Sequence, residues 1–113
     1  MRTAHEVFQQ YQFQKHEPIL RGVTGSYLFE IEGAGYWFIR VRDGTIQMEE
    51  TPHDADCTIR CDEKDFIDII EGRRNLLTAL MQGRVRIDGD ITLAQKFHGL
   101  VSARIETGRR EAA

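Results

Sequence analysis

Two cysteines, four histidines and a few closely spaced acids are the residues of this chain that could do chemistry. Cys57 and Cys61 lie in residues 56–61, where apolar and polar residues alternate as in a strand. Four strand steps of about 3.3 Å place the two cysteines on one face and roughly 13 Å apart. A disulfide needs Cα atoms within about 7 Å, so a straight strand cannot close this pair. We therefore expect a buried, reduced pair rather than a redox or metal pair.

The histidines form no recognisable metal or nucleophile pattern. No two of them have zinc-ligand spacing, and none adjoins a cysteine or serine in a nucleophile motif. His98 follows Phe97 and could reach the mouth of a cavity, although a solvated helix position is the favoured interpretation. The other three are His5, His16 and His53.

Asp88 and Asp90 flank Gly89 and could be read as paired carboxylates. A turn followed by a helix N-cap explains both residues, and we favour that interpretation. The sequence has no P-loop and no G-x-G-x-x-G motif, and the Gly-Ala-Gly of residues 33–35 predicts a hairpin turn. The sequence therefore predicts a protein that is not an enzyme, with no catalytic residue, no metal ligand and no cofactor.

Size and charge limit the remaining classes of protein. The 113 residues allow a single domain, 1–113, with a compact core over 4–101 and a polar tail over 102–113. The formal net charge of −3 argues against a nucleic-acid partner, which needs a basic surface. No run of about 18 apolar residues occurs, and the N-terminus lacks the apolar stretch of a secretion signal. We therefore expect a cytoplasmic protein.

Two basic pairs stand out in this acidic chain. Arg73 and Arg74 form one, and Arg109 and Arg110 form the other. Solvated loop and tail positions explain both pairs. The first pair could also attract an anionic lipid surface.

Period-two alternation predicts five strands, over residues 26–32, 36–42, 45–50, 56–61 and 84–88. Asp43 and Gly44 predict a two-residue hairpin turn between the second and third strands. Four capping residues predict helix starts: Thr3, Asp62, Asn75 and Asp90. The first helix must end before Pro18. This order predicts an α+β fold with one mostly antiparallel sheet and helices on one face.

The last predicted helix, residues 91–101, has a pronounced apolar face. Leu93, Phe97, Leu100 and Val101 recur at i, i+4, i+7 and i+8. This face is more apolar than a small domain needs to stay folded, which favours an apolar ligand. Beyond Val101 the polar tail is expected to fray.

Four segments occur together in a characteristic order. The first is the aromatic-rich strand pair with Trp37 and the turn at residues 43–44. The second is residues 55–59 leading into the capped helix at 62–66, and the third is residues 72–76. The fourth and most specific is Met-Gln-Gly-Arg-Val-Arg-Ile-Asp-Gly-Asp, residues 81–90, followed by Leu93, Ala94 and Phe97. In this order and spacing, from Val7 to about Val101, the chain resembles the sterol carrier protein 2 domain family.

The resemblance implies a five-stranded sheet whose helices enclose an apolar tunnel for sterols, fatty acyl chains or other lipids. Leu76 stands where many relatives have proline, which affects one local turn. The C-terminal residues 111–113 lack the targeting signal of eukaryotic members. This difference favours a bacterial-type, cytoplasmic member whose ligand need not be a sterol.

Three helical faces and one tryptophan are candidates for the tunnel wall. Plain core packing also explains these faces, and periodicity alone favours core packing over a ligand wall. The resemblance makes the two interpretations about equal for the last two helices. Trp37 could lie at a pocket edge or on the exposed sheet face. The candidates are Phe66, Ile69, Ile70, Leu76, Leu80, Met81, Leu93, Phe97, Leu100 and Trp37.

The sequence therefore predicts a non-catalytic carrier of apolar small molecules, such as fatty acyl chains and sterol-like or isoprenoid lipids. The alternative is an accessory factor that presents isoprenoid-quinone or other lipid intermediates to partner enzymes, and a small enzyme comes third. The expected partners are a lipid ligand, transiently a membrane surface, and lipid-modifying enzymes. The oligomeric state stays open.

Overall fold

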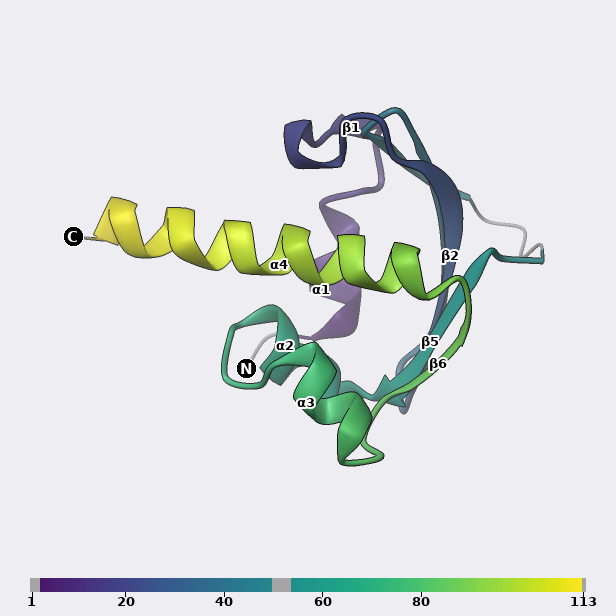
Figure 1. Cartoon of the computed structure of the whole chain (residues 1–113), viewed down its shortest axis with the longest axis vertical. Coiled ribbons are helices and arrows are strands. Elements are labelled where there is room, and N and C mark those ends of the chain that lie inside the picture. The colour runs from purple at the N-terminus through teal and green to yellow at the C-terminus, as the bar shows by residue number, and fades with distance from the viewer. Residues whose placement is uncertain (1–2, 50–53, 113) are drawn as a thin grey trace.

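The computed structural model describes residues 3–49 and 54–112, with side chains as far as Ser102. The helices are α1 (Ala4–Gln9), the 3-10 helix η1 (Pro18–Leu20), α2 (Glu63–Ile70), α3 (Leu76–Met81) and α4 (Ile91–Ala112). The strands are β1 (Lys15–His16), β2 (Thr24–Glu32), β3 (Gly35–Arg42), β4 (Thr45–Glu49), β5 (Cys57–Asp62) and β6 (Arg86–Gly89). Figure 1 shows one curved sheet with the helices gathered on its concave side. The predicted α+β fold is confirmed.

The described strands form one sheet in the order β1-β4-β3-β2-β5-β6. The β2–β5 pair is parallel and the other four pairs are antiparallel, as the prediction of a mostly antiparallel sheet requires. The predicted number of five strands is wrong, because β1 pairs with the start of β4 and adds a sixth. A two-residue strand is too short to show alternation, so the sequence pattern could not reveal it.

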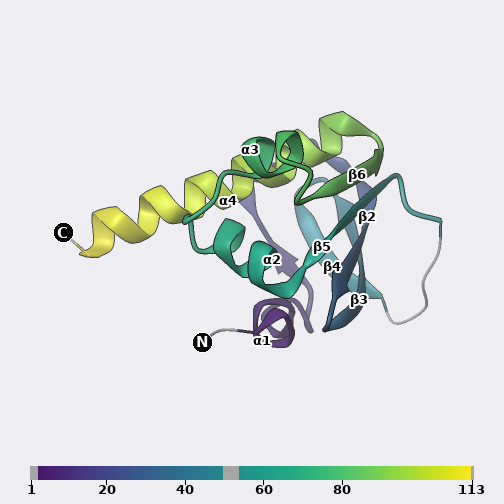
Figure 2. The same ribbon diagram turned by 90° about the horizontal axis from the view of Figure 1, so that it is seen from below.

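Two layers bury the core between the inner face of the sheet and the helices (Figure 2). Tyr27, Phe29 and Ile31 of β2 and Ile39 and Val41 of β3 are all buried on that inner face. The alternation of these strands predicts the same residues to point one way, because successive strand side chains face opposite sides of a sheet.

The predicted capping residues begin their helices. Thr3 accepts a hydrogen bond from the amide of Glu6, and Asp62 accepts one from the amide of Asp65. Asn75 accepts from two amides at the start of α3. The carboxylate of Asp90 accepts from the amide of Thr92, 2.8 Å away, at the start of α4. Each bond satisfies an amide that has no partner within its helix.

The turns also follow local chemistry. Asp43 and Gly44 both have positive φ, 47° and 85°, which is the geometry of the two-residue hairpin that the sequence predicts. Pro18 lies at the start of η1, well after α1 has ended at Gln9. The predicted strand end at Glu50, and His53, lie outside the described residues.

Two predicted boundaries differ from the structure at the C-terminal end. The predicted strand over residues 84–88 is realised as β6, Arg86–Gly89. The predicted end of the last helix at Val101 is wrong, because α4 continues to Ala112. Figures 1 and 2 show the C-terminal half of α4 extending away from the sheet and past the other helices.

Candidate functional site

Five aromatic rings connect the helices to the inner face of the sheet. The Phe8 ring of α1 stacks on Phe66 of α2 and on Trp37 of β3, with centroids 5.3 and 4.6 Å apart. Phe29 of β2 lies 5.2 Å from Phe8 and meets Phe97 of α4 edge to face at 5.2 Å. Aromatic pairs at these separations attract each other beyond their burial. The cluster therefore holds α1, α2 and α4 over the same part of the sheet.

An apolar cavity of about 80 Å³ lies beside this cluster. Residues from α1, η1, β2, β3, β4, α2 and α4 line it, and none of the described lining residues carries a charge. The lining residues are Val7, Phe8, Gln10, Tyr11, Leu20, Tyr27, Phe29, Ile39, Val41, Ile46, Phe66, Ile70, Phe97, Leu100 and Val101.

Two polar side chains of the lining form hydrogen bonds to backbone carbonyls. The Tyr27 hydroxyl donates a hydrogen bond to the carbonyl of Leu93 at 2.6 Å, and burial raises the pKa of Tyr27. The Gln10 side-chain amide donates to the carbonyl of Val7 at 2.9 Å. The cavity can therefore attract a guest mainly by removing apolar surface from water.

Four of the ten wall candidates line the cavity. Phe66 and Ile70 approach it from α2, and Phe97 and Leu100 approach it from α4. These four side chains, predicted from helical periodicity on two segments far apart in sequence, meet in one place.

The other six candidates lie elsewhere in the fold. Ile69 and Leu76 are buried and Leu80 is half-buried, whereas Met81 is 87% exposed on α3. Leu93 is buried at the start of α4. Trp37 is half-buried between Phe8 and His5. None of the six lines the cavity.

The sequence reasoning missed the sheet side of the cavity. Tyr27, Phe29, Ile39, Val41 and Ile46 line it from three strands. The alternation of the strands predicts their inward direction. Alternation shows that a strand residue faces inward, but it does not show whether that residue meets another side chain or a void.

The start of α4 is fixed by a group of contacts that we call the α4 anchor, formed by Ser26, Tyr27, Asp56, Gly89 and Leu93. The Asp56 carboxylate accepts hydrogen bonds from the amide and hydroxyl of Ser26, at 3.0 and 3.2 Å. Its carbonyl accepts one from the amide of residue 90 at 2.8 Å. A side chain at Gly89, where φ is +98°, would place Cβ 2.3 Å from the Asp56 carbonyl oxygen. The chain therefore reaches α4 by one close approach that only glycine permits.

Three lining residues are more exposed than most of the others, and we call them the cavity mouth: Gln10, Tyr11 and Ile70. Gln10 is exposed and the other two are half-buried, unlike most of the lining. Ile70 is the last residue of α2, which ends on the side away from the sheet, where α4 also leaves the body (Figure 2). The mouth therefore lies on the side from which α4 projects.

The two cysteines are free and buried, as expected. Burial, followed by the nearby carboxylates of Asp90, Asp56 and Asp88, raises the pKa of Cys57 to about 11. Burial also raises the pKa of Cys61 to about 12. Both thiols therefore stay protonated near neutral pH, and the thiol is a poor nucleophile.

Charged side chains near the end of α2 are paired with one another. Arg73 contacts Asp68 at 2.9 Å and Glu71 at 3.1 Å, and Arg74 lies 3.5 Å from the buried Asp65. Arg73 and Arg74 are therefore largely neutralised by their neighbours.

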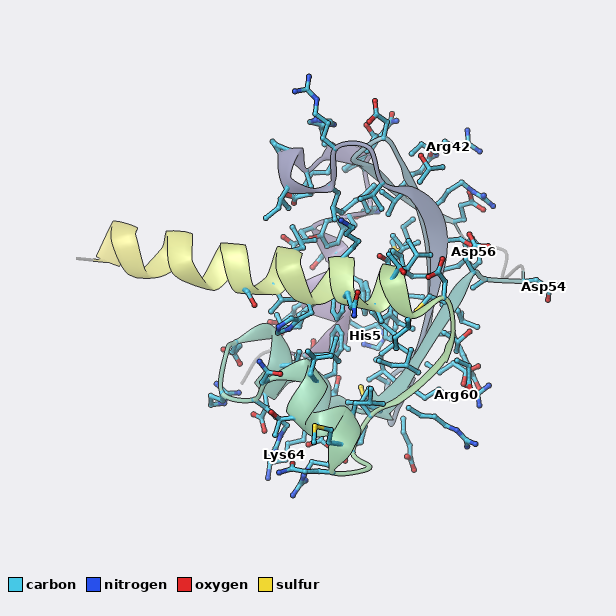
Figure 3. All side chains as sticks on the ribbon, viewed as in Figure 1. His5, Arg42, Asp54, Asp56, Arg60 and Lys64 are labelled. Atoms are coloured by element: carbon cyan, nitrogen blue, oxygen red, sulfur yellow. The ribbon has the colours of Figure 1, made fainter. Side chains whose placement is uncertain are left out.

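Figure 3 shows charged side chains such as Arg42, Arg60 and Lys64 on the outside of the molecule, away from the inner face. Among the described residues, no three His, Cys, Asp or Glu side chains converge as metal ligands. Within the same residues, no helix has the length and apolar character needed to cross a bilayer.

Similarity to known proteins agrees with this architecture. The hydroxysteroid dehydrogenase-like protein 2 of Xenopus laevis is 28% identical over 100 residues, which cover 85% of this chain and 24% of that protein. Sterol carrier protein 2 of Homo sapiens is 28% identical over 93 residues, which cover 77% of this chain and 17% of that protein. The chain thus spans about a quarter or less of the length of these curated relatives.

Two solved structures share the fold. Palmitated SCP2L2 from Aedes aegypti superposes with a TM-score of 0.66 at 18% identity, covering 88% of this chain and 95% of that one. A ubiquinone synthesis protein, UbiJ-SCP2, superposes with a TM-score of 0.65 at 17% identity, covering 88% and 90%.

The model of the SCP-2 sterol transfer family matches residues 5–102, which include every residue that lines the cavity. The chain therefore belongs to the SCP-2 sterol transfer family, a family of lipid and sterol binding or transfer.

Proposed function

We propose that this protein binds and carries apolar small molecules in the cavity between the sheet and helices α1, α2 and α4, and that it catalyses no reaction on them. The single observation that carries the proposal is a cavity without charge, lined from both layers of the fold. The ligand class is fatty acyl chains and sterol-like or isoprenoid lipids, and the proposed location is the cytoplasm. The palmitated state of the Aedes aegypti neighbour supports an acyl ligand.

The hydrophobic effect gives this site enough affinity without a polar constellation. Each methylene removed from water contributes about 0.8 kcal/mol, so a chain of ~16 carbons gains roughly 12 kcal/mol before the entropy costs of association. Because the lining carries no charge, electrostatic attraction contributes little to the binding of such a guest. Affinity should therefore rise with chain length and depend little on salt.

The cavity must widen to take a whole lipid. A volume of about 80 Å³ is smaller than the roughly 150 Å³ of an engineered cavity that holds one benzene. We propose that α4 moves to provide the space, because its start is fixed at the α4 anchor while Phe97, Leu100 and Val101 line the cavity farther along the same helix. The proposed wall keeps Phe66, Ile70, Phe97 and Leu100 from the sequence prediction and adds the inner face of the sheet.

Displacement of a fluorescent fatty acid by unlabelled acids of increasing length tests the proposal. The inhibition constant should fall steadily from about 8 to 16 carbons, by roughly tenfold for every two methylenes until the cavity is filled. A flat series, or no binding at any length, would contradict the proposal.

A matched pair of variants connects binding to the cavity. Ile70→Trp places an indole at the cavity mouth and should weaken fatty-acid binding at least tenfold without lowering the unfolding midpoint. Met81→Trp adds the same ring to an exposed position outside the cavity and should leave binding unchanged. Equal effects of the two variants would place the ligand elsewhere.

The second candidate function is an accessory factor that presents isoprenoid-quinone or other lipid intermediates to partner enzymes. The structural similarity to the ubiquinone synthesis protein, over most of both chains, supports this second candidate function. Affinity purification from cells separates the two roles. Recovery of lipid- or quinone-synthesis enzymes favours the accessory factor, whereas recovery of the protein alone, loaded with mixed fatty acids, favours the general carrier.

A further inference from the structure

We propose that two copies of this chain pair through β6, the strand at one margin of the sheet, and form a two-fold symmetric dimer with one continuous sheet. The feature that carries the proposal is a strand edge centred on Ile87, with an arginine on one side of that residue and an aspartate on the other. The proposal is independent of the ligand, because β6 contributes no residue to the lining of the cavity.

Within the described part of the sheet, β6 has a strand neighbour on one side only. It comes last in the order of the strands and pairs with β5 alone. Figure 2 shows β6 at the margin of the sheet, leading directly into α4. A strand in this position presents backbone groups to which another strand can bond.

The backbone of Ile87 directs its N–H and C=O away from β5. In an antiparallel pair, residues alternate between those that bond to the partner strand and those that point away from it. Asp90 belongs to the bonded set, because its amide donates to the Asp56 carbonyl at 2.8 Å in the register of the β5–β6 pair. Arg86 and Asp88 therefore also point toward β5, and Ile87, between them, points to the free edge.

The two exposed side chains that flank Ile87 have opposite charge. When a second copy pairs antiparallel with Ile87 opposite Ile87, each Arg86 lies directly across from Asp88 of the other copy, in the kind of pair that brings side chains closest. A shift of the two-fold axis by one residue would instead place Arg86 opposite Arg86 or Asp88 opposite Asp88. The charges therefore select a single register.

Arg86 is the member of this pair that gains most from a second copy. Within the described residues it forms no ion pair, and its neighbour across β5 is Arg60, of like charge. Arg60 contacts Asp88 at 3.6 Å, while 47% and 55% of these two side chains stay exposed. A second copy would give Arg86 an opposite charge, and the open carboxylate of Asp88 has room for it.

Exposed apolar side chains adjoin the same edge. Met81 at the end of α3 is 87% exposed, and Ile91 at the start of α4 is 49% exposed. α3 lies against the edge, because the amide of Val85 donates to a carbonyl of α3 at 3.4 Å. In the register centred on Ile87, residue 91 of one copy lies opposite residue 83 of the other, two positions from Met81. The dimer therefore brings Met81 and Ile91 of different copies toward each other and removes apolar surface from water.

The pairing is short, so we expect a reversible dimer. Because α3 already binds the edge at Val85, backbone pairing is limited to residues 86–88. Such an interface stays below the roughly 800 Å² per partner of a standard complex, and we expect a dissociation constant in the micromolar range. Both copies use the same edge, so the contact closes at two copies.

Charges on an edge strand have a second common role, which is to keep other chains away. That role requires only that charges be present, whereas pairing requires that they be complementary about Ile87. Exchanging the two charges separates these roles, because the exchanged order Asp-Ile-Arg is again self-complementary.

Sedimentation equilibrium of the full chain over a concentration series measures the dissociation constant of the dimer. Arg86→Asp and Asp88→Arg each turn two attractive pairs into two repulsive ones, so each should raise this constant roughly tenfold or more. The exchanged double variant, Arg86→Asp with Asp88→Arg, should return it to within roughly threefold of the native value. An equimolar mixture of the two single variants should form a heterodimer. Arg42→Asp, at an exposed arginine of β3, is the control and should leave the constant unchanged.

Hydrogen exchange reports on the edge itself and needs no substitution, so it decides the matter even where a variant fails to fold. The Ile87 amide of the native chain should exchange more slowly as the protein concentration rises. The amide of Ile59, which lies opposite Ile87 and points toward β2, should show no such dependence.

A native chain that stays monomeric throughout the series, or a dimer that survives Arg86→Asp, would overturn the proposal. So would a folded exchanged variant, or a mixture of folded single variants, that remains monomeric. Exchange of the Ile87 amide that does not vary with concentration would also count against it, because the two-fold axis passes through that residue.

Discussion

The α4 anchor and the cavity mouth are built differently. At the anchor, the Tyr27 hydroxyl donates a hydrogen bond to the Leu93 carbonyl. The Asp56 carboxylate accepts a hydrogen bond from Ser26, and the Asp56 carbonyl accepts one from the amide of residue 90. At the mouth, Gln10, Tyr11 and Ile70 leave lining positions partly open to solvent.

The difference shows how one small domain can be stable and still contain a void. A cavity removes packing contacts from its lining and lowers stability. Here the void lies between the two layers, while hydrogen bonds and close backbone packing fix the start of α4 beside it. Changes at the anchor should therefore act on stability, and changes near the mouth should act on ligand exchange.

The largest expected effect is at the anchor, from Gly89→Ala. A methyl group there would lie 2.3 Å from the Asp56 carbonyl oxygen, and φ of +98° is unfavourable for alanine. Because the obstacle is backbone, the chain must shift, and we expect a loss of about 4 kcal/mol or more in the free energy of unfolding. Urea denaturation followed by circular dichroism measures it.

Gly83→Ala is the matched control for that substitution. Gly83 also has a positive φ, +74°, but a Cβ there meets nothing within 4 Å. Strain alone should lower the free energy of unfolding by about 1–2 kcal/mol. If both variants lowered the free energy of unfolding by the same amount, the close approach at the anchor would add nothing to the strain of a positive φ.

Alkaline pH should weaken the sheet next to the anchor through the buried thiols. Burial raises the pKa of Cys57 to about 11 and of Cys61 to about 12, whereas an unfolded thiol titrates near 8.5. The folded state therefore holds these protons more tightly, so the contribution is complete below about pH 8.5 and is lost as pH rises toward the folded values. Each thiol should lower the free energy of unfolding by about 2 kcal/mol between pH 8.5 and pH 10.

Urea titrations at several pH values, with a reductant present, check this expectation. Cys57→Ala and Cys61→Ala lower stability at neutral pH because they leave small cavities. The informative quantity is the slope of stability against pH, which each variant should reduce by about 1.4 kcal/mol per pH unit in this range. Parallel slopes in variant and native chains would mean that the thiols already titrate normally in the fold.

Much of this architecture follows from local sequence rules. Asp62, Asn75 and Asp90 are recognisable caps because a short polar side chain precedes a helical apolar pattern, and the structure confirms each one. The hairpin at Asp43 and Gly44 follows from the need for positive φ at both positions. Such features depend on a few neighbouring residues, so a single sequence is enough to predict them.

The missed features depend on other causes. The periodic apolar face of the last predicted helix ends at Val101, whereas α4 continues to Ala112 through helix formers such as Ala103, Arg104 and Glu106. Met81 falls on the periodic apolar stripe of its helix, but α3 buries only Leu76 and Ala79. Periodicity gives the direction of a side chain and does not tell whether another element packs there.

The same limit explains why the cavity was only partly predicted. Phe97 and Leu93 lie one turn apart on the same face of α4, yet Phe97 lines the void and Leu93 packs against Gly25. A Cβ added to Gly25 would lie 2.8 Å from the Leu93 side chain. The distance between sheet and helix decides which apolar residue faces a gap, and this distance results from all the layers together.

A smaller loss is expected from removing one bond of the anchor. Tyr27→Phe deletes the hydroxyl that donates to the Leu93 carbonyl and keeps the ring in place. A single buried hydrogen bond contributes about 1 kcal/mol, so the free energy of unfolding should fall by that amount. Tyr36→Phe is the control, because Tyr36 is 72% exposed and its change should stay within about 0.5 kcal/mol. Equal effects would show that the hydroxyl of Tyr27 does not hold α4.

The smallest expected change is a gain, from Gly99→Ala. Gly99 lies in α4 between Phe97 and Leu100, and a Cβ there meets nothing within 4 Å. Alanine costs less backbone entropy than glycine in a helix, so the free energy of unfolding should rise by about 0.5–1 kcal/mol. Gln95→Ala, at an exposed position of the same helix, should change it by less than about 0.5 kcal/mol.

Gly99→Ala also separates stability from exchange of ligand. If the cavity widens because α4 bends between the anchor and the mouth, a stiffer helix should take up fatty acid more slowly, although its wall is unchanged. Stopped-flow fluorescence measures the association rate, and the Gln95→Ala chain provides the reference. A more stable Gly99→Ala chain with an unaltered association rate would mean that α4 moves as one rigid rod about the anchor. In that case the movement takes place at the contacts of Tyr27 and Leu93, and the helix itself does not bend.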